Sequence, residues 1–340
     1  MTRYNIAIED SEKNYECDIQ DTLLRSALRA GLGFPYECNS GGCGSCKISL
    51  VEGTVETLWS EAPGLSRRDI RKGRILACQC RPTSDCIIQV SEQPEAKPSI
   101  LPQRYTVRYV ERRDLTRDMS EFVFKSDKPA DFLPGQYALL TLPGIEGDRA
   151  YSMSNLPNKM GQWHFIIKKM PEGKGTHWLF DVLQTGDEVT LDGPYGLAYL
   201  RKDVPRDIVC IAGGSGLSPV MSITRAALSC PELENHNIMM FYGGRGPEDI
   251  CTPQLVSDIE NNHERLSCYN ATSDPVLSER QGWDGECCYV HELVEKVLGD
   301  TLKNYEYYFC GPPKMTECVQ RMLMIEHQVP FEQIHFDRFF

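Results

Sequence analysis

Residues 37 to 46 of the chain read Glu37-Cys38-Asn39-Ser40-Gly41-Gly42-Cys43-Gly44-Ser45-Cys46, and Cys78 follows after 31 intervening residues. Three cysteines spaced C-x4-C-x2-C with a distant fourth are typical of a [2Fe–2S] cluster held by four thiolates. The glycines of this stretch permit positive φ angles and close approach of N–H groups to sulfur, which a loop around a cluster needs. The spacing therefore predicts an electron carrier whose metal ligands are Cys38, Cys43, Cys46 and Cys78.

A zinc site is the alternative interpretation of these cysteines. Zinc sites usually combine two short-spaced cysteine couples, and Cys43-x2-Cys46 with Cys78-x-Cys80 would supply four thiolates. The second couple is tighter than usual, however, and Cys38 would be left over. Cys80 is also a rival for the fourth cluster ligand, although the 31-residue gap favours Cys78.

Length and composition restrict the class of protein. A chain of 340 residues predicts two or three domains. The net charge is −12, and residues 204–340 carry 10 basic and 20 acidic groups, which argues against nucleic acid as a partner. No run of 18 apolar residues predicts a membrane span, and residues 1–5 do not resemble a signal peptide. Fifteen cysteines without such a signal favour a reducing compartment, so we expect a cytoplasmic protein.

Periodicity divides the chain into three modules and a linker. Residues 1–95 show strands with one capped helix, an order compatible with a β-grasp sheet. Residues 96–103 are rich in proline and predict a semi-rigid linker. Residues 104–203 contain regular short strands, which predict an antiparallel barrel. Residues 204–340 repeat strand, Gly-rich turn and helix, which predicts an α/β nucleotide-binding domain.

A candidate site for a heterocycle that carries a phosphate lies at the end of one barrel strand, in Arg149-Ala150-Tyr151-Ser152-Met153-Ser154-Asn155. Arginine can hold a phosphate with two hydrogen bonds, and tyrosine can lie flat on a heterocycle. A serine hydroxyl can bond a ring nitrogen. Downstream, Gly173-Lys174-Gly175-Thr176 precedes a predicted helix at 177–183, where N–H groups and the Thr176 hydroxyl could hold a pyrophosphate.

A second nucleotide site is predicted where the apolar strand 208–212 runs into Gly213-Gly214-Ser215-Gly216-Leu217-Ser218-Pro219 and then a helix at 220–228. Such a turn presents N–H groups and the positive end of a helix dipole to a pyrophosphate. After the next strand, Arg245 could bind a 2′-phosphate, whereas Glu248 and Asp249 could accept from a ribose hydroxyl. The excess of acidic residues in the last third of the chain favours NADH over NADPH.

These motifs, in this order, resemble the NADH-dependent reductase components of bacterial multicomponent oxygenases, within the ferredoxin–NADP reductase superfamily. The resemblance covers the whole chain and is closest to the toluene monooxygenase reductases. That closer match is carried by Phe34–Gly44, Leu76–Cys80, Leu191–Leu197 and Ile334–Phe340. The motifs of the superfamily are Phe132-Leu133-Pro134-Gly135-Gln136-Tyr137, the flavin motif Arg149–Asn155, Gly214-x-Gly216-x-x-Pro219 and Tyr307–Pro313. It implies a β-grasp ferredoxin, a six-stranded antiparallel flavin-binding β-barrel and an α/β domain with a parallel sheet, and the cofactors [2Fe–2S], FAD and NADH.

The resemblance also assigns roles to single residues. It places Cys310 beside the nicotinamide, and it places a C-terminal acid and aromatic, Asp337 and Phe339, over the flavin. With Ser152, these form the expected catalytic set. The expected cofactor-binding residues are Gln136, Tyr137, Arg149, Tyr151, Ser152, Ser154, Lys168, Gly173, Gly175, Thr176, Gly214, Gly216, Pro219, Glu248, Cys310, Gly311 and Phe339.

The implied function is transfer of a hydride from NADH to FAD and of single electrons through the cluster to a Rieske ferredoxin or a di-iron hydroxylase. The partner system would be a toluene-type monooxygenase, with the reductase of a Rieske ring-hydroxylating dioxygenase as the alternative. A redox sensor is disfavoured because no output domain is present. We expect a monomer. The basic run Arg67–Arg74 is either a solvated helix face or a docking patch for an acidic redox partner.

Overall fold

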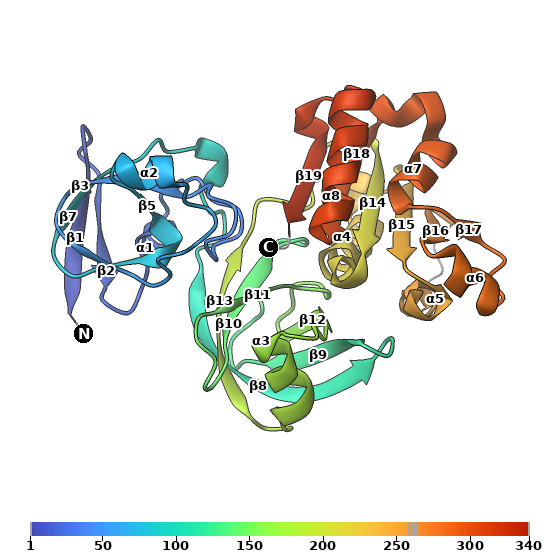
Figure 1. Ribbon diagram of the computed structural model, residues 1–340, viewed down its shortest axis with the longest axis horizontal. Coiled ribbons are helices and arrows are strands. Elements are labelled where there is room, and N and C mark those ends of the chain that lie inside the picture. The colour runs from blue at the N-terminus through green and yellow to red at the C-terminus, as the bar shows by residue number, and fades with distance from the viewer. Residues whose placement is uncertain (1, 258, 260–263, 339–340) are drawn as a thin grey trace.

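The computed structural model describes residues 2–257, 259 and 264–338, and it shows three modules arranged around a common centre (Figure 1). The predicted β-grasp ferredoxin, six-stranded barrel and parallel-sheet α/β domain are all confirmed. Strand β19 (Ile334–Arg338) brings the end of the chain to the centre where the modules meet (Figure 1).

The ferredoxin module is a five-stranded mixed sheet, in the order β2-β1-β7-β3-β5, with one main helix packed on it. Thr22 caps that helix, as its side chain accepts a hydrogen bond from the Arg25 N–H. The elements are β1 (Arg3–Ile8), β2 (Asn14–Asp18), α1 (Leu23–Arg29), β3 (Lys47–Glu52), β4 (Val55–Thr57), α2 (Arg67–Arg71), β5 (Arg74–Leu76), β6 (Cys80–Pro82) and β7 (Cys86–Gln89). Because Leu23, Leu24, Ala27 and Leu28 are fully buried, α1 is fixed to the sheet by its apolar face.

The segment between the first two modules is packed against the ferredoxin module at its start. The Gln93 N–H donates to the Gly33 carbonyl at 2.7 Å, and Ala96 in the 3-10 turn Pro94–Ala96 is fully buried. Strand β8 begins at Gln103, so only residues 97–102 are free of regular structure.

The second module is an antiparallel sheet in the order β11-β10-β13-β8-β9-β12. Its strands are β8 (Gln103–Asp114), β9 (Met119–Lys125), β10 (Tyr137–Thr141), β11 (Arg149–Ser152), β12 (Gln162–Lys168) and β13 (Glu188–Tyr195). A bridge between Met153 and Phe165 joins the two edges and nearly closes the barrel. The helix expected at 177–183 begins earlier, as α3 (Lys174–His177), and continues as a π-helical turn at Trp178–Val182.

The third module is a parallel sheet in the order β17-β16-β15-β14-β18-β19, with helices on both faces (Figure 1). Its described elements are β14 (Asp207–Gly213), α4 (Leu217–Ser229), β15 (Ile238–Gly244), α5 (Thr252–Ser257), β16 (Leu266–Thr272), α6 (Pro275–Arg280), β17 (Glu286–Cys287), α7 (Val290–Leu298), β18 (Tyr305–Gly311), α8 (Pro313–Gln320) and β19. In such sheets ligands bind at the carboxyl ends of the strands, which here are the ends of β14, β15 and β18. In the part of the chain that the structure describes, no helix is both long and apolar enough to cross a membrane.

Candidate electron-transfer site

The four predicted ligand cysteines lie together in two pairs. A hydrogen bond from the Cys43 thiol lowers the pKa of Cys38 to about 5, and a hydrogen bond from Cys46 likewise lowers the pKa of Cys78. Two irons, each held by two thiolates, need two such pairs. Among the described residues, no three or more His, Cys, Asp or Glu side chains are arranged to hold a single ion.

The loop around these thiols is rich in N–H donors. The backbone N–H groups of Ser40, Cys43 and Ser45 donate to cysteine sulfurs at 3.4–3.5 Å. Asn39 is fully buried at a positive φ, and its side-chain N–H group has no partner. Donors directed at sulfur stabilise the negative charge of a reduced cluster, so this loop fits a [2Fe–2S] group.

Cys80, the rival for the fourth ligand, is held away from this group. Its thiol hydrogen-bonds the Thr57 hydroxyl at 3.9 Å in the small β4–β6 ladder, and burial raises its pKa to about 11. It behaves as a small buried side chain. This placement leaves Cys78 as the fourth thiol beside Cys46.

Arg149 and the start of α3 lie side by side in the barrel and form a polar cradle. Gly173 is the N-cap residue of α3, and it has no side chain to bond the helix. The first N–H groups of α3 therefore remain available. A Cβ at Gly175 would lie 3.2 Å from Cγ of Arg149, so a larger residue would crowd that arginine. The Thr176 hydroxyl is used within the loop, since it donates to the Gly173 carbonyl and accepts from the Met170 N–H, both at 3.0 Å. The cradle fits a flavin pyrophosphate.

Ser152 and Tyr151 lie beside this cradle at the end of β11. Ser152 is buried, and Tyr151 is half-buried with a ring 6.4 Å from that of Phe165. The Ser152 carbonyl accepts a hydrogen bond from the Ser218 hydroxyl at 2.6 Å. The flavin strand is thereby tied to the first turn of α4.

Two other predicted flavin residues have different partners. Gln136 closes its turn by accepting from the Leu133 N–H, and it donates to the Gly196 carbonyl. Ser154 is fully buried and donates to Glu121 Oε1 at 2.7 Å. The structure therefore gives both residues roles inside the barrel.

Tyr137 faces the ferredoxin module. Its hydroxyl donates to the carbonyl of Glu37, directly before the first cluster cysteine, at 2.6 Å. This contact connects the barrel to the cluster loop.

Contacts from α4 are functional features that sequence reasoning missed. The Ser222 hydroxyl and the Arg225 guanidinium donate to the carbonyls of Asn155 and Ser154 at 2.7 Å each. Ser218 Oγ accepts from the Ile166 N–H at 3.0 Å. The nucleotide helix is thus held against the backbone of the flavin motif, and only the four-residue spacing of Ser218 and Ser222 hinted at this.

The turn after β14 lies directly against the end of β18. A Cβ at Gly216 would overlap the Cys310 carbonyl oxygen, so only glycine permits this approach. No side chain caps α4 at Gly216, and Pro219 lies in its first turn. Gly214, Gly216, Pro219, Cys310 and Gly311 are therefore brought together, as predicted for a dinucleotide site.

A pocket beside this turn contains three of the predicted residues. Its lining includes Pro219, Cys310, His335 and Asp337. Cys310 and Asp337 are register neighbours on the paired strands β18 and β19. Burial raises the pKa of Asp337 to about 7, and the charges of Glu37 and Cys38 add to the effect. Phe339 lies outside the described residues.

Lys168 and Glu248 lie in a charged seam between the barrel and the nucleotide module. Lys168 pairs with Asp118 at 3.2 Å, and Glu248 pairs with Arg117 at 2.6 Å. The aliphatic part of Lys168 also lies 3.8 Å from the position of a Cβ at Gly214. The seam therefore borders the dinucleotide turn.

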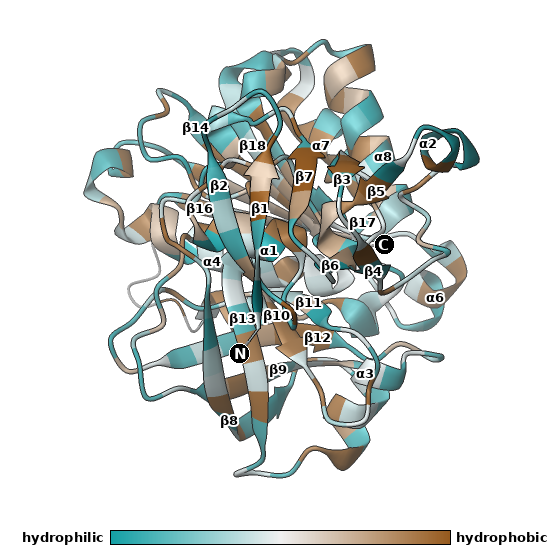
Figure 2. Cartoon of the chain, turned by 90° about the vertical axis from the view of Figure 1, so that its left-hand side faces the viewer, coloured by the Kyte–Doolittle hydropathy of each residue, from teal (hydrophilic) through white to brown (hydrophobic). Residues whose placement is uncertain are grey.

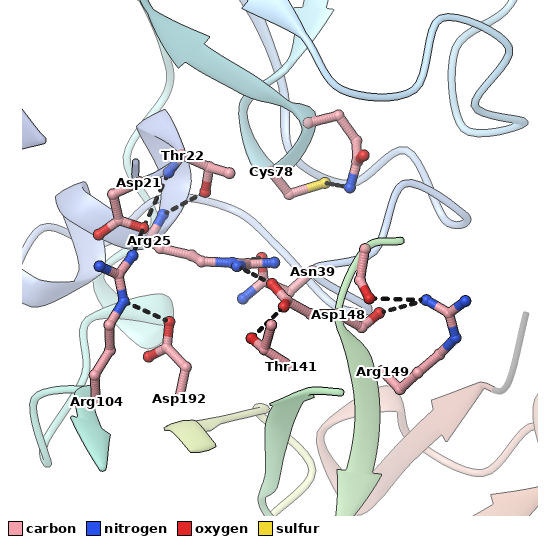
Figure 3. A network of polar contacts seen from close by, with 12 residues as sticks. Asp21, Thr22, Arg25, Asn39, Cys78, Arg104, Thr141, Asp148, Arg149 and Asp192 are labelled. Carbon is pink, nitrogen blue, oxygen red and sulfur yellow. Dashed lines mark hydrogen bonds and ion pairs between the residues drawn. The ribbon is translucent and has the colours of Figure 1, made fainter. Parts of the chain in front are cut away.

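Arginines of α1 join the ferredoxin module to the barrel (Figure 3). Arg25 donates to Asp148 at 2.5 Å and to Asn39 of the cluster loop at 3.4 Å. Arg29 donates to both carboxylate oxygens of Asp192 at 2.7 Å each. Since Asp148 directly precedes Arg149, these contacts place the cluster loop next to the flavin strand.

Comparison with known families agrees with the three modules. Residues 6–83 match the 2Fe-2S iron-sulfur cluster binding domain, residues 106–199 match the oxidoreductase FAD-binding domain, and residues 210–321 match the oxidoreductase NAD-binding domain. The expected cofactors are therefore a [2Fe–2S] cluster, FAD and NADH, and the protein is an oxidoreductase.

Full-length relatives have the same organisation. The chain is 41% identical to the ferredoxin–NAD(P)+ reductase CarAd of Metapseudomonas resinovorans, over 99% of this chain and 100% of the relative. It is 38% identical to the ferredoxin–NAD+ reductase component of the alkene monooxygenase system of Xanthobacter autotrophicus, over 96% and 98%. It is 31% identical to the xylene/toluene monooxygenase electron transfer component XylA of Pseudomonas putida, over 94% and 89%.

A solved structure also matches along its whole length. The ferredoxin reductase in carbazole 1,9a-dioxygenase superposes with a TM-score of 0.92 at 38% identity, covering 100% of this chain and 99% of that one. The cysteine pairs, the flavin cradle and the glycine turn belong to the domains that these relatives share. The chain therefore belongs to the family of ferredoxin–NAD(P)+ reductases that serve oxygenase systems.

Proposed function

We propose that this chain is the reductase component of a multicomponent monooxygenase of the toluene or aromatic type, oxidising NADH and delivering single electrons to a ferredoxin or a di-iron hydroxylase. The observation that carries the proposal is the convergence of Cys310, Asp337 and the cluster loop at one centre. The alkene and xylene/toluene relatives support a monooxygenase partner. The alternative, the reductase of a ring-hydroxylating dioxygenase, is favoured by the carbazole dioxygenase reductase.

When bound, FAD accepts a hydride from NADH and releases electrons one at a time, which a [2Fe–2S] cluster then carries singly. The chain's own residues position these groups. Gly214, Gly216 and the start of α4 hold the dinucleotide, Arg149 and α3 hold the flavin phosphates, and the four cysteines hold the cluster.

Asp337 is the residue that we assign to proton handling at this centre. Its pKa of about 7 lets the carboxyl hold or release a proton at neutral pH. Cys310 beside it stays neutral, because burial raises the pKa of its thiol well above the usual range. Cys310 would therefore adjoin the reacting end of the nicotinamide without contributing a charge.

An anaerobic titration with NADH, followed by visible absorption and EPR, tests the electron path. We expect flavin bleaching together with the rhombic signal of a reduced cluster. Bleaching without that signal would contradict the assignment of the four cysteines, and absence of bleaching would contradict NADH oxidation.

We further propose that the acceptor docks on α2, close to the cluster loop. The exposed helix carries Arg67, Arg68 and Arg71 around an exposed Ile70, and it is largely hydrophilic in Figure 2. Asp69 does not cancel these charges, since it caps the helix at Ser66 and pairs with Lys47 and Arg74. An apolar centre with a basic rim suits an acidic protein.

The link between α2 and the cluster loop is short. The Gly64 N–H donates to the Gly41 carbonyl at 3.0 Å, two residues before α2 is capped. Trp59, which is 45% exposed, lies against Gly41. An acceptor on this face would therefore approach the cluster loop itself.

Charge reversal tests the docking face. R67E/R68E/R71E should slow reduction of the acceptor about tenfold or more at low salt, because complementary charge raises the encounter rate by at least this factor. Reduction of the flavin by NADH should stay within about twofold of wild type. The matched control is K125E/K128E/K159E, which makes the same charge change at exposed barrel positions and should leave both rates unchanged. Equal slowing by the two triple variants would contradict docking at α2.

The subcellular location and the oligomeric state are also proposals. All fifteen cysteines lie in the described residues and are unpaired in disulfides, which fits a reducing compartment, and we propose the cytoplasm. Every group of the electron path comes from one chain, so we propose a functional monomer. Sedimentation of the loaded protein as a single 38.5 kDa species would support this, and a stable dimer would contradict it.

A further inference from the structure

The carboxyl end of β15 is where this nucleotide fold distinguishes the two nicotinamide coenzymes. In doubly wound sheets an acid near the end of the second strand binds the ribose 2′-hydroxyl of NAD, and an arginine there accommodates the 2′-phosphate of NADP. Here β15 ends at Gly244, and Arg245 follows it directly. Arg245 is 57% exposed and would be the natural cation for a 2′-phosphate.

Arg245 is already neutralised from two directions. Within its own loop, Asp249 accepts from both the backbone N–H and Nε of Arg245, at 3.0 and 3.2 Å. From the barrel, Asp118 Oδ2 lies 3.7 Å from Nη2 of Arg245. A phosphate at this guanidinium would therefore have to approach two carboxylates.

Asp118 also neutralises the second cation of this seam. Its Oδ2 lies 3.2 Å from Nζ of Lys168, whose stem borders Gly214 in the dinucleotide turn. The third cation, Arg117, is paired with Glu248 at 2.6 Å. Among these described residues, three cations and three carboxylates balance, so the seam has no surplus positive charge for a dianionic phosphate.

The position of Asp118 is fixed by the barrel. It lies in the tight turn between β8 and β9, where its N–H and one carboxylate oxygen bond the Thr116 hydroxyl at 3.4 and 3.2 Å. Its carbonyl accepts from the Lys169 N–H at 2.7 Å. The carboxylate is thus presented to the nucleotide module by a neighbouring module.

We propose that Asp118 is a specificity-determining residue that excludes NADPH, acting across the module boundary by neutralising Arg245 and Lys168. This deepens the proposed function and rests on the NADH oxidation proposed above. The site distinguishes the two coenzymes at the 2′ position of the adenosine ribose. A hydroxyl is tolerated there, and a phosphate is repelled by the Asp118 carboxylate.

The isosteric variant Asp118→Asn removes this negative charge. We expect about five- to tenfold tighter binding of adenosine 2′,5′-bisphosphate by calorimetry, the size expected for one added net charge near a phosphate in a solvated site. Binding of 5′-AMP should change less than about twofold. The ratio of kcat/KM for NADPH to that for NADH should rise by a similar factor, and the gain should shrink at high salt.

Two further variants define the mechanism. D118N/R245Q should lose the gain, because the cation that Asp118→Asn releases is absent. Asp127→Asn makes the same chemical change at an exposed aspartate just beyond the other end of β9 and should have no effect. If Asp118→Asn fails to fold, Asp118→Ser removes the same negative charge and tests the same expectation.

An unchanged preference for the 2′-phosphate in both Asp118 variants would overturn the proposal. So would a wild-type protein that binds the bisphosphate as tightly as the asparagine variant. Failure of NADH to bleach the flavin would instead contradict the proposed function, and the calorimetric comparison would still report on Asp118.

Discussion

At the scale of single residues, Asp337 is the group with the most unusual chemistry. It is register-paired with Cys310 and lines the same pocket, and its pKa is raised to about 7. A free aspartate titrates near ~4, so the folded protein holds this proton more tightly than the unfolded chain does. The stability contributed by the neutral carboxyl is fully present below about pH 4 and is lost as the pH rises to about 7.

Asp337→Asn should therefore change stability in a pH-dependent way. The amide cannot ionise, so the variant should equal wild type near pH 4 and be more stable above pH 7, by about 1 kcal/mol because the half-buried carboxylate keeps part of its hydration. Denaturant unfolding at both pH values measures this difference. The exposed Asp300→Asn serves as the control. A variant that is less stable than wild type at pH 8 would contradict the raised pKa.

At the scale of elements, the turn between β14 and α4 depends on one close backbone contact. Gly216 lies against the carbonyl of Cys310 and the N–H of Gly311, so the dinucleotide turn and the end of β18 share one space. The Ser218 hydroxyl then links α4 to β11 and β12. Small side chains on α4 thus set the spacing between the two nucleotide-binding modules.

Gly216→Ala should disturb this arrangement. The added methyl overlaps the Cys310 carbonyl, and we expect a loss of about 1–3 kcal/mol of unfolding free energy, as for other overpacked sites. Reduction of the flavin by NADH should slow, while the FAD content should stay at the wild-type level because Arg149 and α3 are untouched. Stopped-flow absorption and denaturant unfolding measure these effects. Unchanged stability and rate would show that the turn can move away from β18.

Elements and site residues differ in how far the sequence predicts them. The cysteine spacing and the glycine turn are local patterns, and the fold class could be predicted from such patterns. Ser154 was predicted to bind flavin, yet its hydroxyl bonds Glu121, which lies 33 positions earlier in the chain. Tyr137 likewise bonds the carbonyl of Glu37 across a separation of 100 residues. Periodicity carries no information on such partners, because they depend on how strands and modules pair.

At the scale of the whole molecule, a charged network decides how the ferredoxin module sits on the barrel. Arg29 bridges Asp21 and Asp192. Arg104 contacts the same two carboxylates at 3.1 and 3.7 Å (Figure 3). Apolar packing supports it, since the barrel residue Tyr195 belongs to the same buried cluster as the ferredoxin core. The interface combines a desolvated ionic network with an apolar centre.

Arg29→Met should weaken this interface. It leaves Asp21 and Asp192 buried with one arginine instead of two, and removing one partner of a buried ion pair costs about 3–5 kcal/mol. We expect slower reduction of the cluster, with an unchanged rate of flavin reduction by NADH, in rapid-mixing experiments. The control is Arg3→Met, which breaks an exposed pair with Glu16 and should leave both the stability and the two rates nearly unchanged. Equal slowing of flavin reduction and cluster reduction would show that the effect does not arise at the interface between the ferredoxin module and the barrel.

The arginines of α1 also bear on attempts to build chimeric reductases. Arg25 and Arg29 belong to the ferredoxin module, but their carboxylate partners Asp148 and Asp192 belong to the barrel. A transplanted module without this matching set would leave the buried Asp192 and the partly buried Asp148 facing an unrelated helix. Exchange of ferredoxin modules between homologous reductases should therefore succeed when the arginines of α1 and their two aspartate partners in the barrel are transferred together. The length of the segment that connects the two modules should not decide the outcome.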